Sequence, residues 1–361
     1  MGLFPLIDNL VIQHKNTHYS QIKFLMKKIL AILFIVFIYL PAISQDELSW
    51  LQRYWALSQQ IANTEDEDKI TKIAQQQINL LQPIYTNYSK DAYNDGIYGR
   101  VCINLIQAYI LSGQYKFAKD IINASIKRIK DNAIKLRLNI EDIKITGLIG
   151  NYEKAELLSA NIAPTISYHI ADLQNYIDET EALYLINVVV NYDTAVSSLQ
   201  TYYINEINNL VQSCEYQKAI DLLLQKKELF TSILLSNKTI DIINKNTNRI
   251  SHKYSINPPL LKQEGRTDPV VYYYAQLALC YNQLGQYSAA TRCYYWAEQH
   301  CLNTDSTSTY LIADNFLMSA RFLRQIGNEL RAEQYYSQCI GICAQSNDDN
   351  LIRDSRLIPS L

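Results

Sequence analysis

The stretch that decides the fold runs from Val271 to Cys301 and reads VYYYAQLALCYNQLGQYSAATRCYYWAEQHC. Apolar and small residues recur in both of its halves with the spacing of one helix face: Tyr274, Leu277, Ala278 and Tyr281, then Tyr287, Ala290, Tyr294 and Ala297. Leu284, Gly285 and Gln286 separate the halves. Two amphipathic helices joined by a glycine turn predict a helical hairpin, whose alanines let the helices approach closely.

This stretch resembles a tetratricopeptide repeat. The 34-residue pattern of that family consists of an aromatic residue, Leu with Gly or Ala, Tyr, a glycine turn, Tyr, Ala, an aromatic residue and Ala. The residues quoted above fill it in order, with Ala278 in the Gly/Ala position and Gly285 at the turn. The resemblance is to exported bacterial members of the family, such as those of Bacteroidetes. It implies stacked hairpins whose first helices line a groove for a protein or peptide partner.

Four looser copies of the turn occur elsewhere in the chain, at Gly113, Gly150, Cys214 and Gly327. Cys214 stands where glycine is usual. The copies keep a Tyr, an Ala or both after the turn: Tyr115 and Ala118, Tyr152 and Ala155, Tyr216 and Ala219, and Ala332. The spacings between turns exceed 34 residues, so longer helices or inserted loops are expected. Residues 191–195, NYDTA, are interpreted as part of a further degenerate unit.

The predicted fold class is therefore all-α, an α-α superhelix (solenoid) of tetratricopeptide-like helical hairpins. The chain of 361 residues has only 10 Gly and 8 Pro, which favours long helices over a fold of many strands and tight turns. The expected organisation is 1–25 upstream of the true start or disordered, 26–44 a signal peptide, 45–235 N-terminal degenerate repeats, 236–269 a connecting segment, 270–348 a C-terminal repeat pair and 349–361 a tail.

The segment 26–44 has the three parts of a secretory signal peptide. Met26, Lys27 and Lys28 precede a twelve-residue apolar run, and Ala42 and Ser44 provide small residues before a cleavage point at Gln45. Twelve residues are short for a membrane span, which needs about 20. Export to the periplasm or cell envelope is expected, with a signal anchor as the alternative and no span after cleavage.

No sequence motif for catalysis or for a cofactor stands out. A Gly-rich phosphate loop, a GxSxG elbow and an HExxH helix are all lacking, and the net charge of −2 does not point to nucleic acid. Neither a metal nor a cofactor is expected. His300 and Cys301, with Cys280 and Cys293 nearby, lack the paired spacing of a zinc site. The seven cysteines are interpreted mainly as buried thiols, with a bond from Cys280 to Cys293 or Cys301 left open.

The family resemblance implies that first-helix residues contact the partner. Carried over by position, these are Arg100, Gln107, Tyr272, Asn282, Arg321 and Arg324. The expected function is a non-catalytic scaffold. The alternatives are a regulatory partner of a separately encoded protease or kinase, and, less favoured, an enzyme on a helical scaffold. Two further tracts, at Thr194 and Ser306, resemble the Asp-Ser/Thr acceptors of O-glycosylation in Bacteroidetes envelope proteins.

Overall fold

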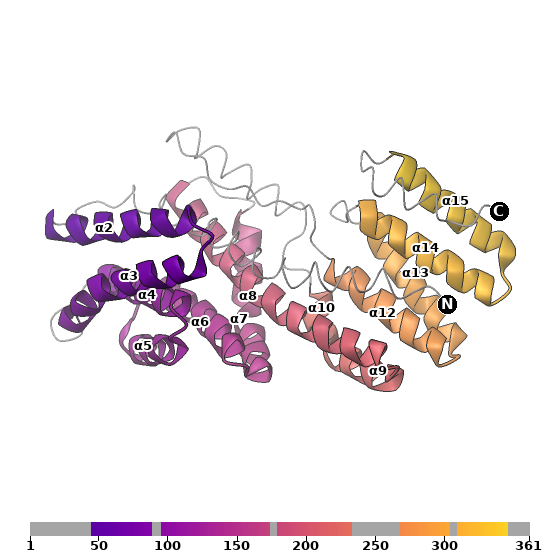
Figure 1. Cartoon of the computed structure of the whole chain (residues 1–361), viewed down its shortest axis with the longest axis horizontal. Coiled ribbons are helices and arrows are strands. Elements are labelled where there is room, and N and C mark those ends of the chain that lie inside the picture. Colours follow the sequence, from indigo (N-terminus) through magenta and orange to yellow (C-terminus); the bar gives the residue numbers. More distant parts are fainter. Residues whose placement is uncertain (1–44, 89–94, 174–178, 233–267, 304–308, 346–361) are drawn as a thin grey trace. The chain divides into compact units, whose positions relative to one another are not determined.

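The computed structural model describes residues 45–88, 95–173, 179–232, 268–303 and 309–345, and every regular element in these ranges is a helix. Helices adjacent in sequence pack as neighbouring pairs, as Figure 1 shows for the last two. The all-α prediction is confirmed for these ranges. In chain order the helices are α2 (Gln45–Ala62), α3 (Glu67–Tyr88), α4 (Asp95–Leu111), α5 (Tyr115–Arg128), α6 (Asn132–Leu148), α7 (Tyr152–Leu173), α8 (Glu179–Gln212), α9 (Tyr216–Gln225), α10 (Lys227–Thr231), α12 (Pro269–Gln283), α13 (Tyr287–Asn303), α14 (Thr309–Gln325) and α15 (Glu329–Gln345).

The five turns identified in the sequence share one backbone geometry. Each contains a residue in the left-handed conformation, with φ of 74° at Gly113, 83° at Gly150, 57° at Cys214, 72° at Gly285 and 82° at Gly327. The following amide donates to the carbonyl oxygen five residues earlier, over 2.8–3.0 Å: Gln114 to Tyr109, Asn151 to Thr146, Glu215 to Leu210, Gln286 to Tyr281 and Asn328 to Leu323. This is the bonding of a Schellman cap, which ends a helix sharply and so allows the next to begin within three residues.

A buried alanine lies in the first turn of the second helix of each hairpin. These residues are at most 1% exposed: Ala118, Ala155, Ala219, Ala290 and Ala332. Each donates its amide N–H, over 3.0–3.3 Å, to the carbonyl oxygen of the residue just before its helix. A larger side chain at these positions would have to displace the neighbouring helix. The small residues and the turns that the sequence pattern selected therefore belong to one repeated structural unit.

The described part of the long interval between Gly150 and Cys214 consists mainly of two long helices, α7 and α8. α8 is 34 residues long and passes through residues 191–195 without interruption. Residues 191–195 therefore form no turn of the kind found at the other five positions. With the 22 residues of α7, α8 accounts for most of the interval. Thr194 fits within α8 because its hydroxyl donates to the Val190 carbonyl at 2.8 Å.

The described residues form two compact units, whose boundary falls between Leu199 and Gln200 in α8. The core of the first unit is built from residues of α2 to α6, including Tyr98, Leu105 and Ile122, each at most 1% exposed. The second unit contains the end of α8 and the helices α9 to α15. Its core is rich in aromatic rings. The predicted connecting segment, 236–269, lies outside the described residues apart from Asp268 and Pro269, where α12 begins.

None of the helices in the described ranges is long and apolar enough to cross a membrane. The predicted signal peptide, residues 26–44, lies outside those ranges, as do the upstream stretch 1–25 and the tail 349–361.

Candidate functional site

Four of the six predicted partner-binding residues lie on α12 and α14, the first helices of the two C-terminal hairpins. Asn282 is near the end of α12 and is 9% exposed. Its side-chain nitrogen donates to Gln325 Oε1 at 3.1 Å, so it connects α12 to the end of α14. Gln325 was not predicted from the sequence. Its partner is 43 residues away, a separation that helical periodicity does not reveal.

Arg321 and Arg324 lie on the exposed side of α14. With Asp314 and Leu317 they follow the spacing i, i+3, i+7 and i+10, and we call these four residues the α14 face. Arg324 Nε is 3.7 Å from Glu329 Oε2, and the two side chains are 52% and 65% exposed. An ion pair so open to water contributes little to stability. Both guanidinium groups are thus accessible to a carboxylate-bearing partner.

Tyr272, in contrast, takes part in packing inside the second unit. Its hydroxyl lies 2.9 Å from Asn208 Oδ1 and 3.3 Å from the carbonyl oxygen of Ile204, both on α8. Its ring packs against Phe230, with centroids 5.9 Å apart. Burial raises the pKa of the Tyr272 hydroxyl above its ordinary value. The side chain therefore holds α12 against α8, and only part of it is available to a partner.

Arg100 and Gln107 lie in the first unit, on α4, and both are half-buried. The six predicted residues are thus divided between the two units, with two on α4 and four on α12 and α14. Within the second unit, the Asn282–Gln325 hydrogen bond links the end of α12 to the end of α14, next to Arg324. The role of the six residues in binding stays a prediction.

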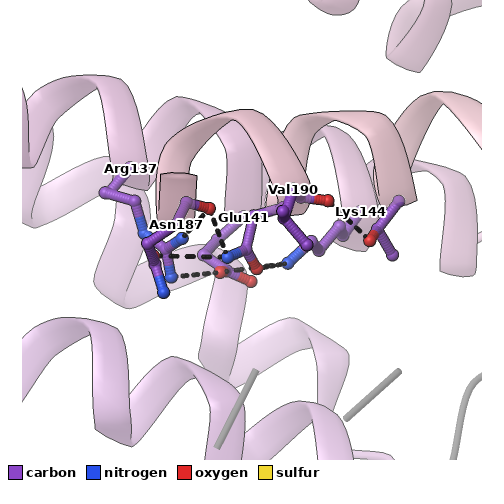
Figure 2. A network of polar contacts seen from close by, with 7 residues as sticks. Arg137, Glu141, Lys144, Asn187 and Val190 are labelled. Atoms are coloured by element: carbon purple, nitrogen blue, oxygen red, sulfur yellow. Dashed lines mark hydrogen bonds and ion pairs between the residues drawn. The ribbon is translucent and has the colours of Figure 1, made fainter. Parts of the chain in front are cut away.

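The most extensive polar cluster of the described residues lies between α6 and α8 in the first unit (Figure 2). Glu141 is 1% exposed, and its Oε1 lies 3.2 Å from Lys144 Nζ and 3.6 Å from Arg137 Nη2. Lys144 also donates to Asn191 Oδ1 at 2.7 Å, and Arg137 donates to the carbonyl oxygen of Asn187 at 3.3 Å. One carboxylate therefore lies between two cations that both reach across to α8.

This cluster was not expected, because charged residues on a helix usually indicate a solvated face. Arg137, Glu141 and Lys144 share one face of α6, and the contacts with Asn187 and Asn191 show that α8 lies against this face. Burial, reinforced by the positive charge of Arg137, lowers the pKa of Lys144, and the attraction of Glu141 opposes this. The buried Glu141 carboxylate is already engaged by two cations of its own helix. We interpret the cluster as a structural connection that fixes the register of α6 against α8.

His300 and Cys301, considered above as metal ligands, lie at the end of α13, and Asp268 influences both of them. His300 Nε2 is 3.0 Å from Asp268 Oδ2, and Asp268 Oδ1 accepts from the amides of Val270 and Val271 at the start of α12. Burial of Cys301 raises its thiol pKa to about 12, which opposes formation of a nucleophilic thiolate. Across the described ranges, no group of three or more His, Cys, Asp or Glu residues is placed to hold a metal ion.

All seven cysteines are free thiols in the structure. Five are buried, as the core spacing predicted: Cys102, Cys280, Cys301, Cys339 and Cys343. The bond from Cys280 to Cys293 or Cys301, left open by the sequence, is not formed. Cys214 is the exposed member of the set, at the turn where the other hairpins have glycine.

The two predicted glycosylation positions have different outcomes. Thr194 is part-buried in the middle of α8, and its hydroxyl is hydrogen-bonded to the Val190 carbonyl. A glycosyltransferase would need this hydroxyl released and the helix locally opened. Ser306 lies outside the described residues. Modification at both positions stays a prediction.

Comparison with known proteins adds no further constraint on the site. No protein-family model matches the chain, and no curated protein matches it significantly.

Proposed function

We propose that this protein is an exported scaffold of the tetratricopeptide type, which binds a protein or peptide partner along the first helices of its hairpins and has no catalytic role. The observation that carries the proposal is the five-fold recurrence of one turn, with the same left-handed residue, the same cap and the same buried alanine. In solenoid proteins, stacked hairpins of one kind build a superhelix with a concave binding face, and we propose the same arrangement for this chain.

The α14 face is the best-supported part of this binding surface. It combines a half-buried apolar residue, Leu317, with two exposed guanidinium groups, Arg321 and Arg324. Guanidinium groups bind carboxylates through paired hydrogen bonds, and apolar surface beside them adds affinity and specificity. The Asn282–Gln325 hydrogen bond holds the end of α12 beside the two arginines, so the surface extends over two first helices.

The test is affinity capture from the envelope fraction with the mature chain, beginning at Gln45, and two matched double variants. Arg321→Gln with Arg324→Gln alters the α14 face. Arg292→Gln with Arg331→Gln removes the same charge from exposed positions on the second helices α13 and α15. We expect the first pair to abolish capture of partners that the second pair retains. Equal capture by both variants would exclude the α14 face as the binding surface.

Export is a separate part of the proposal and has its own test. N-terminal sequencing of the protein recovered from the envelope should begin at Gln45. Recovery of a chain that retains residues 26–44 in the membrane fraction would support the signal-anchor alternative instead.

A further inference from the structure

Helix α14 buries two sides that differ in chemistry. The side that faces α15, the second helix of the same hairpin, is apolar, and the thiol buried there has a hydrogen-bond acceptor. Phe316 packs on Tyr335 with ring centroids 5.5 Å apart, Ala320 is fully buried, and the Cys339 thiol donates to the Ala313 carbonyl at 3.2 Å. This side makes α14 and α15 one closely packed hairpin.

The other buried side of α14 carries Asn315, Ser319 and Phe322, spaced i, i+4 and i+7. They are 3%, 2% and 3% exposed. The Phe322 ring lies 5.1 Å from the ring of Tyr294 and 6.4 Å from that of Tyr287, both on α13. This side therefore faces the preceding hairpin, α12/α13. We call the contact between the two hairpins along this side the inter-hairpin seam.

The middle of the seam is polar and unsatisfied. Neither the nitrogen nor the oxygen of the Asn315 amide has a hydrogen-bond partner in the protein, and the same is true of the Ser319 hydroxyl. Near one end of the seam, Asn282 Oδ1 is also unpartnered. A buried donor or acceptor without a hydrogen-bond partner costs free energy, which is recovered when water reaches it. The interface between two helical repeats is usually apolar and does not carry this cost. The seam thus favours an open, hydrated state more than the interior of either hairpin does.

Two hydrogen bonds hold the seam closed around this centre. One is the Asn282–Gln325 bond described above, and the other joins the Tyr335 hydroxyl of α15 to the Glu298 carboxylate of α13. Tyr335 is 8% exposed, and both bonds lie on side chains that reach across the seam. Opening would break these two bonds and the contacts of Phe322 with Tyr294 and Tyr287, and it would expose the apolar packing that Ala278 and Ala290 share with α14. In return, water would hydrate Asn315 and Ser319.

We infer that the hairpin α14/α15 undocks from α12/α13 as one cooperative unit, in a partial opening that precedes global unfolding. The α14 face moves with it, so opening separates Arg321 and Arg324 from Asn282. The inference rests on the seam alone and would stand if the proposed function were wrong. The role of this opening would be to let a partner select between a closed and an open arrangement of the two first helices, α12 and α14.

Native-state hydrogen exchange followed by mass spectrometry tests this on the full mature chain. Peptides from both α14 and α15 should exchange faster than peptides from α12 and α13. Ser319→Ala removes one unsatisfied hydroxyl and should slow exchange in α14 and α15 by about tenfold. Asn315→Leu should act in the same direction. Tyr335→Phe breaks a bond across the seam and should speed exchange in the same two helices.

Ser337→Ala, at an exposed position of α15, is the matched control and should leave every peptide unchanged. Equal protection of the two hairpins in the parent protein would overturn the inference. So would a Ser319→Ala variant with unaltered exchange, because that result would mean that solvent already satisfies this hydroxyl in the closed seam. Ser319→Ala and Tyr335→Phe change only one polar group each, so they keep the test valid if Asn315→Leu does not fold.

Discussion

Replacing Glu141 by Gln should be among the most damaging single changes in the first unit. The substitution keeps the size of the side chain and removes the negative charge that lies between Arg137 and Lys144. Arg137 is 4% exposed, so its positive charge would remain buried without the carboxylate that compensates it. Glu141 contacts both cations within α6, so the contacts of Arg137 and Lys144 with Asn187 and Asn191 on α8 would remain, but without the charge that compensates them.

The magnitude follows from the burial of the carboxylate. Removing one partner of a buried ion pair destabilises proteins by about 3–5 kcal/mol, because the other charge is left in a poorly solvating environment. Lys144 limits the loss, because burial already lowers its pKa and loss of the opposing attraction of Glu141 would lower it further, which weakens the charge left uncompensated. We therefore expect a loss of about 3 kcal/mol for Glu141→Gln at pH 7.

Lys144→Met provides the internal comparison. It removes the second cation and leaves the Glu141–Arg137 pair, while Asn191 Oδ1 loses a donor at 2.7 Å. The net loss should be no more than about 1–2 kcal/mol, the usual cost of one unpaired buried acceptor. Adding Lys144→Met to Glu141→Gln should recover part of the stability, because it removes one of the two uncompensated charges.

The direction of the pH dependence follows from the lowered pKa of Lys144. Between this pKa and the ordinary value of 10.5, the unfolded chain binds more protons than the folded one. The stability of the first unit should therefore gain a contribution as the pH rises through that interval, and Lys144→Met should abolish it.

Urea unfolding monitored by tryptophan fluorescence measures these effects. The chain has three tryptophans, so in a Trp296→Phe background the signal comes only from Trp50 and Trp55, both on α2 in the first unit. A loss below about 1 kcal/mol for Glu141→Gln would refute the reasoning, as would a loss for Lys144→Met equal to that for Glu141→Gln.

Three further changes test the turns, the α12 cap and the thiols. Cys214→Gly should stabilise the second unit by about 0.5–1 kcal/mol in urea unfolding, because glycine adopts positive φ without strain, and Gly285→Ala should destabilise it by a similar amount. Burial opposes ionisation of Asp268, but the hydrogen bonds from His300 and two backbone amides hold the pKa of its carboxyl group below 3.8. The ionised carboxylate therefore stabilises the fold above pH 3.8, and this stabilisation disappears as the pH falls through the lowered pKa. Asp268→Asn should therefore lose about 1–2 kcal/mol at pH 7 and show a flatter acid limb in unfolding monitored by circular dichroism. An aromatic disulfide reagent should modify Cys214 first in the folded protein and should reach the buried thiols only when the protein unfolds. Rapid reaction of several thiols in the folded protein would contradict the packing described for the five buried cysteines, Cys102, Cys280, Cys301, Cys339 and Cys343.

The turns could be predicted from the sequence because their causes are local. A left-handed residue, a Schellman cap and a small residue five positions later are all encoded within a few residues of Gly113, Gly150, Gly285 and Gly327. Cys214 was found through Tyr216 and Ala219, although the turn residue itself is unusual. The continuous helix through residues 191–195 shows the opposite case. A Tyr and an Ala at suggestive spacing do not make a turn without a residue that adopts positive φ.

The tertiary polar contacts could not be predicted in the same way. Tyr272 was expected on the partner-binding surface because the family resemblance implies that first-helix residues line the groove. Its hydroxyl instead contacts Asn208, which is 64 residues away. The α6 cluster depends likewise on Asn187 and Asn191, 47 to 50 residues from the charges that they contact. Periodicity identifies which residues share a face. It does not show which faces another helix covers.

The identical turns also bear on how such a chain can change its length. Five hairpins share the same backbone geometry at the turn between their two helices, so recombination between two such turns would insert a second helix and the first helix that follows it without creating a new kind of turn. A duplication between Gly113 and Gly150, for example, would insert 37 residues in phase with the existing pattern. Only the side chains at the new contacts between hairpins would then need to adapt, which makes gain or loss of a hairpin a single genetic step.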